Sequence, residues 1–143
     1  MKNRIKIEGK GVPIVLVHGM GGPNIWLPVV DVLKDKFQVI VPTFPGFLKE
    51  DIDIKYSDKL YVDFLISVRE FLNIEKWNVI GISMGGRTAI NYSLKEINHV
   101  TSLTLIDSIG AGYMSPILRL PFMNKVFPFF FRVCSKVNQI ETS

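Results

Sequence analysis

Short runs of apolar residues divide the chain into segments that predict β-strands. Residues 5–8 alternate apolar and polar side chains, which is typical of a strand with one exposed face. The later runs are continuous and rich in Val, Ile and Leu, as expected for strands buried on both faces. These runs cover residues 14–17, 37–41, 77–80 and 100–106. The pattern therefore predicts one exposed strand followed by four buried ones.

Helical spacing separates these strands. Apolar residues between 26 and 33 recur at i, i+3, i+4 and i+7, the spacing of one helix face, and Asn24 can cap the helix that they predict. A second helix is expected from about residue 57 to 72, and a third after residue 86. Strands that alternate with helices indicate βαβ units, so the expected fold class is α/β with a mostly parallel sheet.

The segment Gly81-Ile82-Ser83-Met84-Gly85 has the form G-x-S-x-G and stands between a predicted strand and a predicted helix. In that setting a sharp turn lifts the serine Oγ above the sheet and holds the serine in a strained backbone conformation. Side chains at Gly81 and Gly85 would collide across so tight a turn. The N-terminus of the following helix favours an anionic intermediate. These features predict a nucleophile elbow centred on Ser83; the alternative is an ordinary glycine-rich turn.

A glycine-rich loop, His18-Gly19-Met20-Gly21-Gly22, follows the first buried strand. Small residues let the loop backbone approach a substrate, so one of its N–H groups can donate to an oxyanion. Met84, the residue after the predicted nucleophile, would donate the second N–H. The position of this loop, one strand–helix–strand passage before the elbow, makes the two motifs more specific together than apart.

Together these segments resemble the α/β-hydrolase family. The resemblance covers about residues 5–110 and rests on the strand and loop at 9–19, on Pro45-Gly46, and on residues 79–86 and 103–107. It implies an α/β-hydrolase sheet that is truncated after the sixth strand of the family's order.

The resemblance also assigns roles and boundaries. It implies Ser83 as the nucleophile, the N–H groups of Met20 and Met84 as the oxyanion hole, and His18, Gly19, Gly81 and Gly85 as supporting residues. It further implies a core over residues 1–110 and the start of an apolar cap or lid over residues 111–143.

The sequence offers no clear base for the predicted nucleophile. The family's order is Ser, then an acid, then His, but no histidine follows His99. His18 belongs to the glycine-rich loop, where a histidine more often holds the loop than takes protons. His99 precedes a strand, which places it roughly 20 Å from the carboxyl ends of the strands, where Ser83 is expected. We therefore expect an incomplete chain that lacks the catalytic histidine.

Asp107 stands at the carboxyl end of the last predicted strand. A minority of the family places its acid there, so Asp107 is a possible acid. The alternative is a structural aspartate that bonds the backbone of the next turn.

Composition narrows the remaining possibilities. The chain has 143 residues, of which 48% are hydrophobic, and a formal net charge of +4. The apolar content argues against disorder, and the scattered basic residues argue against a nucleic-acid partner. A single cysteine, and the absence of a signal peptide or of an apolar run of eighteen residues, predict a cytoplasmic protein. We expect no metal site and no cofactor.

Two functions are compatible with the sequence. The first is a serine hydrolase that acts on an ester, thioester or similar acyl bond of a small molecule, through an acyl-enzyme on Ser83. The second is a non-catalytic relative that binds a hydrophobic small molecule or a partner chain, which the missing histidine favours. Membrane contact through residues 113–131 is the weaker explanation of their apolar character, since a cap over a substrate pocket also accounts for it. An open strand edge at 100–106 would allow self-association.

Overall fold

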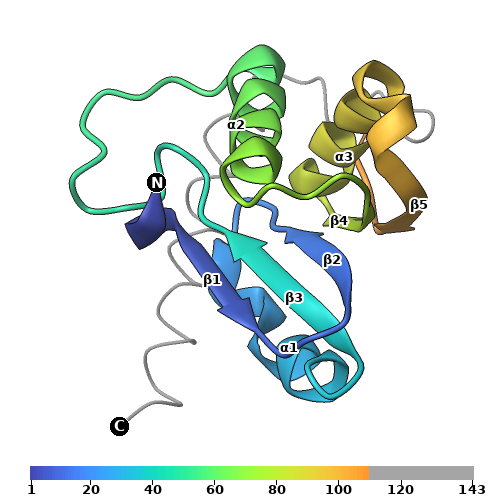
Figure 1. The fold of residues 1–143 in the computed structure, drawn as a ribbon. Helices are drawn as coiled ribbons and strands as arrows, with labels where there is room; N and C mark the ends of the chain where they lie inside the picture. Colours follow the sequence, from blue (N-terminus) through green and yellow to red (C-terminus); the bar gives the residue numbers. More distant parts are fainter. Residues whose placement is uncertain (110–143) are drawn as a thin grey trace, which may run out of the picture. The chain divides into compact units, whose positions relative to one another are not determined.

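A computed structural model describes residues 1–109 of the chain, so the predicted cap at 111–143 lies outside the described residues. Five strands form one sheet in the order β1-β3-β2-β4-β5 (Figure 1). The strands are β1 (Ile5–Glu8), β2 (Val12–Val17), β3 (Phe37–Pro42), β4 (Trp77–Ile82) and β5 (Val100–Ile106). Only β1 runs antiparallel to its neighbour. The predicted α/β class with a mostly parallel sheet is confirmed, and the five strands lie where the apolar runs of the sequence predict them.

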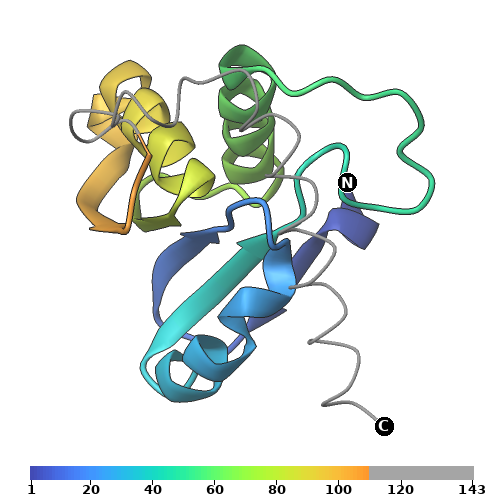
Figure 2. The ribbon, with the colours of Figure 1, turned by 180° about the vertical axis from the view of Figure 1, so that it is seen from behind.

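Helices cover both faces of the sheet. They are α1 (Leu27–Leu33), α2 (Asp58–Phe71) and α3 (Met84–Lys95). Val15 and Val17 of β2 belong to one apolar cluster with residues of α2 and α3, whereas Ile14 and Leu16 pack with Trp26 beside α1. Side chains alternate along a strand, so α1 lies on the face opposite α2 and α3, as the two views in Figures 1 and 2 show. The continuous apolar run in β2 is buried on both faces, as predicted.

The start of α1 differs from the prediction. Asn24 does not cap this helix: residues Pro23–Trp26 form a 3-10 turn, and no side chain caps α1. The glycine-rich loop therefore enters the helix through a tighter turn, which delays the helix start to Leu27. The predicted second helix is confirmed as α2, where the Ser57 Oγ accepts the N–H of Leu60 at 3.1 Å.

The expectation that residues 100–106 form a buried strand was wrong. Every residue of β5 after Val100 is exposed, and Leu103 keeps 38% of its surface accessible. The reason is position: β5 is the last strand of the described sheet and pairs only with β4. Its other edge has no partner among residues 1–109. In the same part of the chain, no helix is long and apolar enough to cross a membrane.

Candidate active site

Ser83 lies at the sharp turn between β4 and α3 with a strained backbone. Its φ of 54° and ψ of −123° fall outside the regions that non-glycine residues favour. Its N–H donates to the Ile106 carbonyl at 3.0 Å, and its own carbonyl accepts the N–H groups of Gly86 at 3.0 Å and Ile109 at 3.1 Å. Hydrogen bonds from the end of β5 and from the first turn of α3 therefore hold the strained conformation. A nucleophile elbow has this strand–turn–helix geometry, which holds the nucleophile at the carboxyl end of a strand.

Close packing explains the two glycines that flank the serine. A Cβ on Gly81 would lie 2.7 Å from the Cβ of Ala89. A Cβ on Gly85 would lie 2.3 Å from the carbonyl oxygen of Val17 and 2.4 Å from that of His18. The first turn of α3 therefore rests directly on the end of β2, and no larger residue fits between them.

The loop after β2 lies against this turn. A Cβ placed on Gly19 would be 3.1 Å from the Cβ of Ser83 and 3.6 Å from the nitrogen of Met84. Within residues 1–109, the N–H groups of Met20 and Met84 donate to no acceptor. Met84 is the first residue of α3, where N–H groups have no partner inside the helix and the helix dipole is positive. The arrangement can therefore place donors beside Ser83.

His18 is fully buried, and both of its ring nitrogens are occupied. The Phe44 N–H donates to His18 Nε2 at 3.1 Å, so Nδ1 carries the proton and donates to the Gly19 carbonyl at 2.7 Å. Burial lowers the pKa of His18 to about 4, which keeps the ring neutral near pH 7. A histidine held in this way supports the loop and has no nitrogen left to accept a proton from Ser83.

His99 and Asp107 lie at opposite ends of β5. His99 precedes the strand, and its Nδ1 is 2.7 Å from the Glu75 carbonyl oxygen. The length of β5 separates His99 by roughly 20 Å from the carboxyl ends of the strands, where Ser83 lies. Asp107 follows β5 with φ 43°. Because β4 and β5 are parallel, Asp107 and Ser83 both stand at the carboxyl ends of these strands. The structure thus brings Ser83, the loop at 18–20 and Asp107 together and leaves His99 apart.

Sequence reasoning missed the contribution of Phe44. This residue follows β3, is fully buried and lies between His18 and α2. Its ring is parallel to that of Tyr61 with centroids 4.2 Å apart, and it lies 4.9 Å from the His18 ring. The Pro45-Gly46 pair after it signalled a turn, but no sequence pattern indicated that the turn would contact His18.

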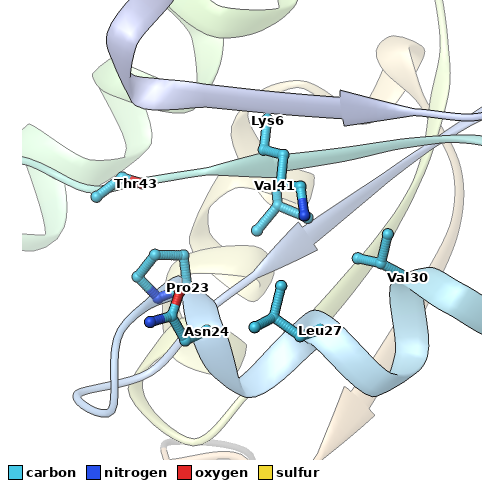
Figure 3. A pocket seen from close by; sticks show the side chains of 7 residues that line it. All are labelled: Lys6, Pro23, Asn24, Leu27, Val30, Val41 and Thr43. Carbon is cyan, nitrogen blue, oxygen red and sulfur yellow. The ribbon is translucent and has the colours of Figure 1, made fainter. Parts of the chain in front are cut away.

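A pocket of about 140 Å³ lies beside α1 (Figure 3). None of its lining residues belongs to the elbow at 81–85. Its polar side chains are Lys6, Asn24 and Thr43, and Leu27 contributes to its apolar wall. The Lys6 ammonium already lies 2.7 Å from a Glu8 carboxylate oxygen, so its charge is largely balanced. No cluster of three or more metal-ligating side chains occurs within residues 1–109.

Two curated proteins are similar to this chain. A 2-hydroxymuconate semialdehyde hydrolase from Pseudomonas sp. strain CF600 is 28% identical over 120 residues, a match that covers 79% of this chain and 42% of that protein. A pimeloyl-(acyl-carrier protein) methyl ester esterase from Legionella pneumophila strain Paris is 34% identical over 131 residues, covering 90% of this chain and 51% of that protein. The chain thus spans about half the length of these curated relatives.

Solved structures give the same result. The structure of an esterase from a marine microorganism superposes with a TM-score of 0.75 at 25% identity, covering 85% of this chain and 48% of that chain. The sequence model of the alpha/beta hydrolase fold matches residues 12–135. Because that match spans most of the sequence, the chain belongs to the α/β-hydrolase fold family.

Proposed function

We propose that Ser83 is the nucleophile of a serine hydrolase that cleaves an ester, thioester or similar acyl bond. The observation that carries the proposal is the strained turn at Ser83 with the Gly19 backbone packed against it. Such strain persists only where the surrounding structure enforces it, and it concentrates at functional sites.

The proposed reaction uses the two loops in different ways. The Ser83 Oγ bonds to the acyl carbon and loses its proton to a base, while the carbonyl oxygen takes up the negative charge. The N–H groups of Met20 and Met84 stabilise this oxyanion. The leaving group departs with a proton, and water then hydrolyses the acyl-enzyme to release the acid and restore the Ser83 hydroxyl.

The base does not come from the described residues under this proposal. Both ring nitrogens of His18 are occupied, and His99 lies at the amino-terminal end of β5, away from Ser83. The sequence holds no other histidine, so the proposal assigns the base to neither of them. Asp107, on the Ser83 side of the sheet, is the candidate acid to orient it.

Labelling with a fluorophosphonate probe, read by intact mass, tests the proposal on the full chain. Ser83→Ala is the test variant, and Ser67→Ala on the surface of α2 is the matched control. Because an oxyanion hole alone keeps part of the rate, we expect slow labelling at one site in the wild type and in Ser67→Ala, and none in Ser83→Ala. An adduct that survives in Ser83→Ala would refute the role of Ser83. A folded wild type without an adduct would contradict the proposal that the oxyanion donors alone support reaction at Ser83, and would favour the binding function described next.

A second candidate function is the binding of a hydrophobic small molecule or a partner chain without catalysis. The specific observation in its favour is that neither histidine is placed to activate Ser83. Thermal stabilisation by a hydrophobic ligand, equal in the wild type and in Ser83→Ala, would favour this function over the first.

A further inference from the structure

The N-terminal segment is joined to the segment after β3 by a shielded ion pair. The Arg4 guanidinium donates to both carboxylate oxygens of Asp51, with Nη1 at 2.9 Å from Oδ2. The Asp51 side chain is 3% exposed and the Arg4 side chain 18%. The Arg4 carbonyl also accepts the N–H of Thr43 at 2.7 Å. Figure 1 shows the N-terminal turn beside this segment. A two-point pair with so little exposure fixes geometry far better than an exposed ion pair.

Asp51 in turn shapes the tight bend at residues 44–48. Its Oδ2 accepts the N–H of Gly46 at 2.8 Å and that of Leu48 at 3.0 Å. Gly46 has a φ of 96°, a left-handed conformation that the bend requires and that glycine permits. The hydrogen bonds from Arg4 and these two amides hold the pKa of Asp51 well below its usual range. The carboxylate therefore stays ionised and keeps the bend in place at neutral pH.

The bend connects directly to the candidate active site. Phe44 begins it, and its N–H donates to His18 Nε2 at 3.1 Å. Tyr61 fixes the next residue, since its hydroxyl donates to the Pro45 carbonyl at 3.1 Å. His18 in turn holds the Gly19 carbonyl, because its Nδ1–H donates to that oxygen at 2.7 Å.

The last hydrogen bond determines where the Met20 N–H points. The Gly19 carbonyl and the Met20 N–H belong to one planar peptide unit, and the described chain contains no cis peptide bond. In a trans unit these two groups point in opposite directions. By holding the carbonyl on its own side, His18 directs the Met20 N–H away from itself.

We propose that Arg4 is a positioning residue of the candidate active site, which acts through Asp51, the bend at 44–48 and His18 to orient the Gly19–Met20 peptide. The inference builds on the proposed function, because that function gives the Met20 N–H its role at the oxyanion. Arg4 is not itself a catalytic residue under this proposal, since its side chain bonds to Asp51 and to the Phe44 carbonyl.

NMR on the full ¹⁵N-labelled chain tests each link. Arg4→Met removes the pair, whereas Arg4→Lys keeps the charge but loses the two-point contact. Lys6→Met is the matched control, since it removes an exposed ion pair two residues further along the chain, in β1. The readouts are amide exchange at Phe44 and Gly46, the amide shift of Met20 and the ring ¹⁵N shifts of His18. Exchange of the Val79 amide, in the interior strand β4 between β2 and β5, reports global opening.

We expect Arg4→Met to raise exchange at Phe44 and Gly46 by at least about tenfold relative to Val79 and to shift the Met20 and His18 signals. Arg4→Lys should give intermediate changes, and Lys6→Met none. The proposal is overturned if Phe44 and Val79 exchange rise together, because Arg4 would then stabilise only the fold. Unchanged Met20 and His18 signals overturn it as well.

Failure of this inference can be told apart from failure of the proposed function. The NMR signals come from unreacted chain and do not depend on whether Ser83 is reactive. If wild-type Ser83 takes up the fluorophosphonate, Arg4→Met should slow the labelling roughly tenfold through the misdirected N–H. Labelling at the wild-type rate in that variant would overturn the inference and leave the role of Ser83 intact.

Discussion

Replacing Gly85 with alanine measures how tightly α3 is packed on β2. The new Cβ would lie 2.3 Å from the Val17 carbonyl oxygen and 2.4 Å from that of His18. Both are backbone atoms at the end of a central strand, so they cannot rotate away as a side chain would. Ordinary contact begins near 3.4 Å, which means that the first turn of α3 has to move by about 1 Å.

A displacement of this size is an overpacking defect in a buried layer. Such defects destabilise proteins by about 1–3 kcal/mol, and the higher helix propensity of alanine offsets at most about 1 kcal/mol. Because the clash involves two backbone oxygens at once, we expect the upper part of that range and a net loss of roughly 2 kcal/mol in the free energy of unfolding. Ser83 precedes the displaced turn, so its labelling by a fluorophosphonate should slow as well.

Urea unfolding followed by far-ultraviolet circular dichroism provides the measurement. With a slope of about 1–3 kcal/mol per molar urea, the midpoint should fall by about 1 M. Gly21→Ala is the matched control, since a Cβ at Gly21 would meet nothing within 4 Å. It should change stability by less than about 0.5 kcal/mol. A Gly85→Ala protein as stable as Gly21→Ala would refute the packing argument.

Three further predictions address single groups. Burial lowers the pKa of His18 from its ordinary 6.5 to about 4, so between pH 6.5 and pH 4 the unfolded chain binds more protons than the folded chain. The free energy of unfolding should therefore fall by roughly 3 kcal/mol over this pH range, and His18→Gln should flatten this part of the urea-midpoint profile. Ser83→Gly relieves the strained φ and should raise stability by about 1 kcal/mol while abolishing labelling; a less stable variant would contradict the strain. Tyr92→Phe removes the acceptor of the buried Trp77 indole N–H at 3.1 Å and should cost about 1–3 kcal/mol, so an unchanged urea midpoint would count against this hydrogen bond.

The strands could be predicted because their signal is local. A continuous Val- and Ile-rich run such as residues 14–17 needs cover on both faces, and β2 has it. The same signal at residues 100–106 predicted burial that the described structure does not show. An apolar run indicates that a strand can be buried, whereas the actual exposure of the strand depends on which elements pack beside it. Only β4 pairs with β5 among residues 1–109.

The site shows the same division between local and distant information. The strained turn at Ser83 was predictable, because glycines at 81 and 85 are the local requirement of a strand-to-helix turn. The partners of His18 were not, because Phe44 lies 26 residues away and no periodicity links the two. The Arg4–Asp51 pair spans 47 residues and joins two charges that the sequence presents as ordinary surface residues.

Under the proposed function, the described residues provide the groups that stabilise the oxyanion, but not the base that takes the proton from Ser83. The oxyanion donors are backbone groups, fixed by the packing of Gly19 and Gly85 and by a neutral His18, so they form without a base being present. When a catalytic triad is removed, an oxyanion hole and substrate binding together still leave about 10³–10⁴-fold acceleration over water. Under the proposed function, residues 1–109 would therefore stabilise the negative charge on a bound acyl group before any base is in place. Under the proposed function, the base has to reach the carboxyl ends of β4 and β5, which Ser83 and Asp107 follow.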